Sequence, residues 1–147
     1  MKNGGTTRFG PVLFVPGERG GRYPFCNSLY IEEAGIVIDP ASDRSFLADL
    51  RNRGAVRQVW LSHFHEDHVA DLDLFEHLPI GISEEDAPPM KSLEGLLDRY
   101  GITDPTDRTY WGRVFVDRFR FRPRVPSFFF REGDTCDVGG DTVQVLA

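Results

Sequence analysis

The sequence predicts an α/β layered fold, because strand-like and helix-like segments alternate through its first hundred residues. Apolar runs at 35–38 and 56–61 have the length and composition of buried strands. Between them, Ser42 can cap a helix that runs to about Arg53 with its apolar residues on one face. This succession of strand, helix and strand is the basis of the prediction.

Further elements are expected on both sides of this unit. Each is an apolar run, or an amphipathic stretch, bounded by proline, glycine or a capping residue. We predict strands at 11–15, 27–31 and 79–82, a short helix at 71–78, and a helical region from 83 to 101 that Pro88 and Pro89 interrupt.

From Tyr110 onward the sequence predicts β-structure. Aromatic and arginine residues alternate there: Phe119 and Phe121 have one parity, Arg118 and Arg120 the other. The alternation favours a strand with one buried and one solvated face. An arginine surface that grips an anionic substrate or a nucleic acid is the alternative. The last residues, 133–145, predict a hairpin that turns at two glycines.

Composition and charge bound the functional classes. The 147 residues suit one domain, with 40% hydrophobic and 27% charged residues. A formal charge of −6 argues against general nucleic-acid affinity, and no run is long enough to span a membrane. Cys26 and Cys136 form no disulfide framework, which favours a reducing, cytoplasmic location; one bridge between them is the alternative.

The chemistry is concentrated at 62–68, directly after the strand expected at 56–61. Three of the chain's four histidines lie there, as His63, His65 and His68, together with Asp67. His63 and His65 are two residues apart in an extended segment, so they point to the same side and can bind one metal ion. Asp67 and His68 can face a second ion. Imidazoles and a carboxylate suit zinc, with iron or manganese as alternatives.

This His-x-His-x-Asp-His pattern resembles the hallmark motif of the metallo-β-lactamase superfamily. Other segments agree with the resemblance: Asp39 ends a strand as in the family, and 133–145 resembles the hairpin before the family's next metal-binding motif. The resemblance covers the chain from about Tyr23 to its end. It implies the N-terminal αβ half of an αββα sandwich, so that residues 1–147 would be one such domain truncated at its C-terminus.

The resemblance also implies a function. One or two zinc ions would be bound, the first by His63 and His65 and the second by Asp67 and His68. A zinc-bound hydroxide would attack a small ester, thioester, lactone or amide substrate, with Asp67 as the catalytic residue that orients it. Asp39 would not bind the metal itself but would hold the metal loop in place by hydrogen bonds. Asn27 stands where the family often has an asparagine near the site, although a turn asparagine fits equally well.

Two departures limit these expectations. Val69, Ala70 and Asp71 stand where many thioesterase-like members carry two glycines, which weakens a glyoxalase-type or β-lactamase assignment. The family's later histidines and bridging aspartate have no counterpart in residues 1–147. We therefore expect weak metal retention, and self-association or pairing with a complementary C-terminal half. We also expect partly uncovered apolar strand residues, such as Val59, Leu61, Val143 and Val145. The alternative functions are a phosphodiesterase or nuclease, and a non-catalytic remnant. His77 lies outside the motif and is not expected to bind metal.

Overall fold

Seven strands form one mixed sheet in which their spatial order equals their order in the chain. The computed structural model describes residues 5–146. The pairs from β1 to β4 are antiparallel, and those from β4 to β7 are parallel. The strands are β1 (Thr7–Phe9), β2 (Val12–Val15), β3 (Ser28–Ile31), β4 (Ile36–Ile38), β5 (Gln58–Trp60), β6 (Ile80–Ser83) and β7 (Phe128–Phe130).

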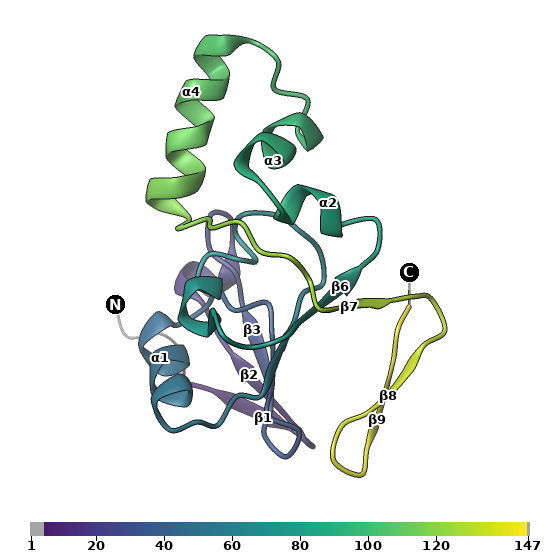
Figure 1. Cartoon of the computed structure of the whole chain (residues 1–147). Helices are drawn as coiled ribbons and strands as arrows, with labels where there is room; N and C mark the ends of the chain where they lie inside the picture. The colour runs from purple at the N-terminus through teal and green to yellow at the C-terminus, as the bar shows by residue number, and fades with distance from the viewer. Residues whose placement is uncertain (1–4, 147) are drawn as a thin grey trace.

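Helices lie in the connections between the parallel strands, because a parallel pair requires a long crossover connection, and this is usually helical. Helix α1 connects β4 to β5, and α2, α3 and α4 all lie between β6 and β7, where they stand together at the top of Figure 1. The bounds are α1 (Arg44–Asn52), α2 (Ala87–Met90), α3 (Leu93–Arg99) and α4 (Pro105–Arg113), with short 3₁₀ helices η1 (Glu18–Gly21) and η2 (Leu72–Phe75) and a π-helical turn η3 (Val114–Arg118).

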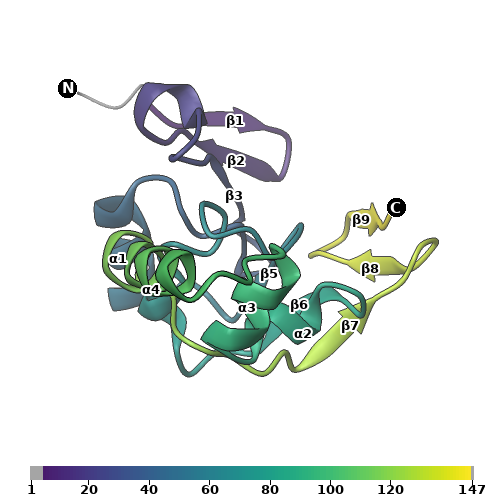
Figure 2. The ribbon, with the colours of Figure 1, turned by 90° about the horizontal axis from the view of Figure 1, so that it is seen from above.

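The two faces of the sheet pack against different layers. Val37 and Val59 point to the helical face and join a large core that includes Leu47 of α1 and Leu96 of α3. Trp60, with the opposite parity, belongs to a smaller core on the other face. There the sheet packs against the separate hairpin of β8 (Thr135–Asp137) and β9 (Thr142–Gln144), and Figure 2 shows α1 and α4 on one side of β5 and this hairpin on the other.

This layered arrangement confirms the α/β prediction and the predicted final hairpin. The expectation that Val59 and Leu61 are uncovered is wrong: both are buried, since their side of the sheet lies under the helices. Val143 and Val145 are only partly buried, as expected. Cys26 and Cys136 are both free, so the alternative disulfide is not formed. No helix in residues 5–146 combines the length and apolarity needed to cross a bilayer.

The β-structure predicted from Tyr110 onward begins only at β7, so the expected strand around Arg118 to Phe121 is wrong: α4 and η3 extend to Arg118, and residues 119–127 form no helix or strand. The Asp104 carboxylate caps α4 by accepting from the amides of Thr106 and Asp107, and Pro105 takes the first helical position. Phe115 and Phe119 are four residues apart. Residues at this spacing lie on the same face of a strand and also on the same face of a helix, so the sequence pattern does not distinguish the two structures. Both phenylalanines are buried, as the strand prediction also required.

Smaller differences concern where helices begin and end. The N-cap of α1 is Asp43, whose carboxylate accepts from the amide of Phe46, and not Ser42. The helix expected at 71–78 is the shorter 3₁₀ helix η2. Pro88 and Pro89 do not interrupt a helix but lie in the first turn of α2, where a missing amide proton costs nothing. Strand β1 was not expected from the sequence.

The arginines of the C-terminal third make contacts that hold the chain together. Arg120 donates to the Asp71 carboxylate and, at 3.0 Å, to the carbonyl of Ala70. Arg124 donates to the carbonyls of Phe75 and Leu78 at the end of η2. Arg131 lies 3.5 Å from Glu84. These guanidinium groups are engaged by protein acceptors and form no common strand face.

Candidate metal centre

The candidate site begins where two neighbouring parallel strands end. Ile38 of β4 pairs with Trp60 of β5, which places Asp39 beside the start of the histidine loop. The amide of Asp39 donates to the carbonyl of Trp60 at 3.0 Å. Asp39 has a φ of +52°, in the left-handed region that aspartate and asparagine tolerate better than most residues. The turn directs the Asp39 carboxylate back toward the loop.

Asp39 holds the histidine loop through three contacts. Its Oδ1 accepts from the amide of Ser62 at 2.8 Å, and its Oδ2 accepts from the Ser62 hydroxyl at 2.6 Å. The same Oδ2 lies 2.9 Å from Nδ1 of His68. The carboxylate is buried, and a buried carboxylate needs such donors. These are the hydrogen bonds expected of a residue that supports metal ligands from outside.

These contacts also orient two of the three imidazoles. Nδ1 of His68 donates to Asp39, so Nε2 is the ring nitrogen left to face a metal ion. Nδ1 of His63 lies 2.9 Å from the Ser62 hydroxyl, and that hydroxyl already donates to Asp39, so it accepts from His63. Each ring therefore uses Nδ1 for support and presents Nε2, the arrangement of metal-binding histidines with a supporting partner.

The predicted ligands lie together. The ring centroids of His63 and His65 are 4.4 Å apart, and those of His63 and His68 are 4.1 Å apart. Oδ2 of Asp67 is 3.8 Å from Nε2 of His68. Three imidazoles and one carboxylate are thus gathered at the end of β5, whereas His77 is exposed at the end of η2.

The surroundings shift the pKa of two of these histidines in opposite directions. Burial, followed by the neighbouring imidazoles of His68 and His65, lowers the pKa of His63 and keeps it neutral. Burial also lowers the pKa of His68, but the hydrogen bonds to Asp39 and Cys26 outweigh it and raise the pKa to about 10. A neutral imidazole is the form that binds metal, so His63 is already in that form.

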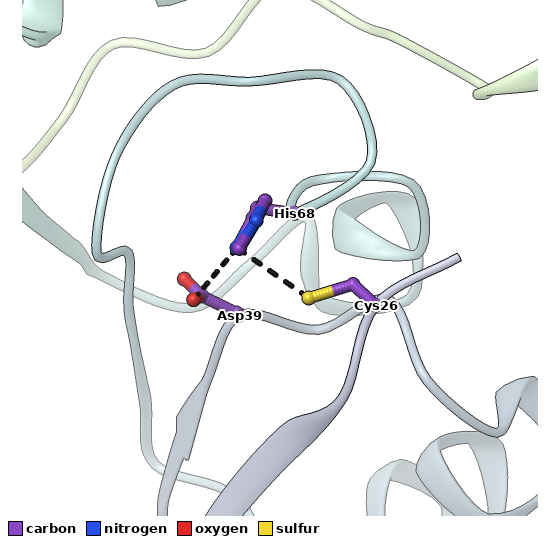
Figure 3. A group of neighbouring side chains, drawn as sticks. All are labelled: Cys26, Asp39 and His68. Carbon is purple, nitrogen blue, oxygen red and sulfur yellow. Dashed lines mark hydrogen bonds and ion pairs between the residues drawn. The ribbon is translucent and has the colours of Figure 1, made fainter. Parts of the chain in front are cut away.

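Cys26 adds a neighbour that the sequence did not indicate. Its Sγ lies 3.4 Å from Nδ1 of His68, and Cys26, Asp39 and His68 together offer three candidate ligand atoms within 4.8 Å (Figure 3). However, Nδ1 of His68 is the atom that donates to Asp39, and a protonated nitrogen cannot also bind a metal. The thiol itself donates to the carbonyl of Asn27 at 3.1 Å. We therefore conclude that Cys26 and Asp39 orient the His68 ring and that these three residues do not form a metal site of their own.

Glu66, inside the motif, is buried and is bound by two tyrosines. Its carboxylate accepts from the hydroxyl of Tyr23 at 3.0 Å and from the hydroxyl of Tyr100. Burial and the bond to Glu66 raise the pKa of Tyr23 to about 12 and raise that of Tyr100 as well, so both hydroxyls remain donors. Tyr100 follows α3, and no spacing in the sequence places it against Glu66.

Asn27 fits the structural interpretation better than a role at the metal centre. Its side chain accepts from the amide of Gly17 at 3.0 Å and donates to the carbonyl of Gly20 at 3.2 Å. Gly21 packs so closely on it that a Cβ would lie 2.4 Å from the Asn27 amide nitrogen. Asn27 therefore fastens the glycine-rich loop to β3.

Comparison with known proteins identifies the family of this chain. The family model of the metallo-beta-lactamase superfamily matches residues 21–147. The chain belongs to the metallo-β-lactamase superfamily. The comparison with curated proteins finds no match.

Two solved metallo-β-lactamases share the superfamily fold with this chain. GOB-18 from Elizabethkingia meningoseptica has 18% identity and a TM-score of 0.61, covering 99% of this chain and 51% of its own. FEZ-1 from Legionella gormanii has 15% identity and a TM-score of 0.58, covering 93% and 50%. The chain thus spans about half the length of these superfamily members, as the resemblance to one half of the sandwich implied.

Proposed function

We propose that this chain carries part of the metal centre of a hydrolase that acts on an ester, thioester, lactone or amide. The observation that carries the proposal is the convergence of His63, His65 and His68 beside Asp67. The hydrogen bonds around the cluster strengthen the proposal, because Ser62 and Asp39 accept from the Nδ1 atoms of His63 and His68. Such a constellation at a strand end, within a superfamily of metallo-hydrolases, supports hydrolysis over a purely structural role.

The donor set fits zinc, with iron or manganese as alternatives. His63 and His65 would hold one ion, and Asp67 and His68 a second. When bound, zinc lowers the pKa of water from 15.7 to about 7 and so supplies hydroxide at neutral pH. Asp67 would accept the proton of that water and orient it toward the substrate carbonyl. Asp39 is a positioning residue, because it touches the ligands and not the reacting atoms.

The ligand count supports a further proposal about completeness. A catalytic zinc takes three protein ligands and keeps one open position. His63 and His65 supply two to the first ion, and Asp67 and His68 supply two to the second. We propose that a complementary C-terminal half, or a second copy of the chain, provides the remaining ligands, and that residues 1–147 alone hold metal weakly and turn over slowly.

Metal analysis and a substrate panel test these proposals together. Bound zinc, iron and manganese are measured by equilibrium dialysis against each metal ion, for the parent chain and for His63→Ala, His65→Ala and His77→Ala. We expect both motif variants to lose metal and His77→Ala to retain it, because His77 lies outside the cluster. Equal metal content in all four proteins would overturn the metal centre.

Activity is measured separately on carboxylic esters, thioesters, lactones, amides and phosphodiesters, with and without a chelator. Chelator-sensitive hydrolysis of an acyl substrate supports the hydrolase. Metal binding without turnover, even with a C-terminal half supplied, would favour a non-catalytic remnant. We do not favour the nuclease, because Arg120 and Arg124 are held by protein acceptors.

A further inference from the structure

A cavity of about 510 Å³ opens directly beside the candidate metal centre. His65 and Asp67 are among the residues that line it, so a molecule in the cavity can place one end against the proposed metal ligands. Its walls come from the helical connection between β6 and β7, a region distant in sequence from the motif. The wall residues are Tyr100, Ile102, Trp111 and Phe115.

The aromatic residues of this wall form a continuous row that begins at His65. The ring of Tyr100 stacks on that of His65 with centroids 5.7 Å apart, and on that of Phe115 at 5.5 Å. Phe115 in turn contacts Trp111 at 6.1 Å. Phe115 is buried in the main core, which fixes the row. Trp111 remains 37% exposed, so it has apolar surface available for a ligand.

The polar groups around the cavity disfavour an anionic ligand. The Tyr23 and Tyr100 hydroxyls already donate to Glu66 and are not available as donors to a ligand. Among the described residues that line the cavity, there is no arginine or lysine, whereas Glu66 and Asp67 both carry carboxylates. A charged group buried here would lack a partner, and burying an unpaired charge is costly. An apolar group would replace water along the aromatic row at a gain in free energy.

We propose that this cavity binds the uncharged, apolar acyl group of the substrate, with the scissile carbonyl at the rim beside His65 and Asp67. The proposal rests on the proposed hydrolase function and narrows its substrate class to esters, thioesters, lactones or amides of apolar carboxylic acids. Trp111 and Ile102 would set the preferred chain length.

Binding is tested without catalysis, using methyl ketones as non-hydrolysable analogues of acyl groups. Calorimetric titrations of the metal-free protein compare 2-octanone with 2-butanone. We expect 2-octanone to bind more tightly by at least tenfold, and Trp111→Ala to remove most of this preference. Phe9→Ala is the control, since Phe9 is an exposed aromatic residue on β1 that does not line the cavity. No binding of 2-octanone, or equal losses in both variants, would overturn the proposal.

Selectivity is tested with 4-nitrophenyl esters from acetate to octanoate, using zinc-loaded protein. Each buried methylene should raise kcat/KM about fourfold until the cavity is filled, and Trp111→Ala should flatten the series. The half-ester of adipic acid should be far poorer than the hexanoate, because its carboxylate would enter the cavity. Ketone binding that depends on Trp111, without hydrolysis of any ester, supports the cavity and overturns the hydrolase. Ester hydrolysis that does not depend on chain length, together with no ketone binding, supports the hydrolase and overturns the cavity as the acyl site.

Discussion

Nδ1 of His68 lies 2.9 Å from Oδ2 of Asp39, and this contact joins the histidine loop to the end of a neighbouring strand. The same oxygen accepts from the Ser62 hydroxyl, which lies 2.9 Å from Nδ1 of His63. One carboxylate therefore orients two imidazoles, one directly and one through a serine. Both rings present Nε2 to the candidate metal centre.

Replacing Asp39 by asparagine should weaken zinc binding about 10- to 100-fold, because the side-chain amide cannot accept all three hydrogen bonds. Asparagine tolerates the left-handed backbone at this position, so the turn itself is preserved. Zinc affinity is measured by competition with a chromophoric chelator. Asp49→Asn is the control, since Asp49 pairs with Arg53 on the exposed surface of α1. Unchanged affinity in Asp39→Asn would contradict the assigned role.

Cys26→Ala should leave the metal content unchanged, because the Cys26 thiol supports His68 and is not expected to bind the metal itself. Cobalt substitution provides the measurement. A thiolate ligand produces a charge-transfer band in the near ultraviolet, and we expect the cobalt form of the parent chain to lack it. A band that disappears in Cys26→Ala would instead place the metal at Cys26, Asp39 and His68.

Tyr100→Phe should lower the free energy of unfolding by about 1–3 kcal/mol, because Glu66 is buried and loses a donor to its carboxylate. Tyr23→Phe should cost less, since Tyr23 is largely exposed and water can replace its hydroxyl. Urea denaturation measures both, with Tyr110→Phe, an exposed tyrosine on α4, as control. A larger loss in Tyr23→Phe would show that Tyr100 is not the main partner of Glu66.

The Arg44–Asp73 pair predicts a pH-dependent contribution to stability. Arg44 makes two hydrogen bonds of 2.8 Å to the Asp73 carboxylate and lowers its pKa below the usual value. A carboxyl with a depressed folded-state pKa stabilises the protein above its unfolded pKa, near 4, and loses this effect as pH falls through the folded value. Both side chains are partly solvated, which limits the contribution to about 1 kcal/mol.

Asp73→Asn should therefore be less stable than the parent at pH 7, with the difference shrinking below about pH 4. Denaturation curves over this range measure it. Glu84→Gln, which removes a partner from a more exposed pair with Arg131, should differ little from the parent at any pH. A difference for Asp73→Asn that grows toward low pH would have the wrong sign for this account.

Residues 1–147 alone should self-associate as concentration rises. Strand β1 is an edge of the sheet and carries Phe9, which is 64% exposed, and an open edge can pair with another chain. Sedimentation velocity over a concentration series measures the association. Phe9→Lys should reduce it, because charged side chains on an edge strand oppose pairing, whereas Val125→Lys, at an exposed loop position, should not. A monomer at every concentration would contradict the prediction.

The sequence by itself determined the features that depend on local order along the chain. The spacing of His63, His65, Asp67 and His68 after an apolar strand predicted the cluster, since residues a few positions apart have few ways to separate. The alternation of strands and helices predicted the layered class for the same reason. After Tyr110 the spacing of the apolar residues was insufficient to decide between strand and helix, because Phe115 and Phe119 share a face in both. The capping residue Asp104 and the following Pro105 are the local signal that favours the helix.

Only the tertiary structure decided which distant residues complete the site. Asp39 was expected near the loop by resemblance, but its pairing with Ser62 and His68 depends on the parallel register of β4 and β5. The bond between Tyr100 and Glu66, and the aromatic row from His65 to Trp111, depend on how the connection between β6 and β7 packs against the core. Such contacts join residues tens of positions apart, and packing selects them from many arrangements that the local sequence allows equally.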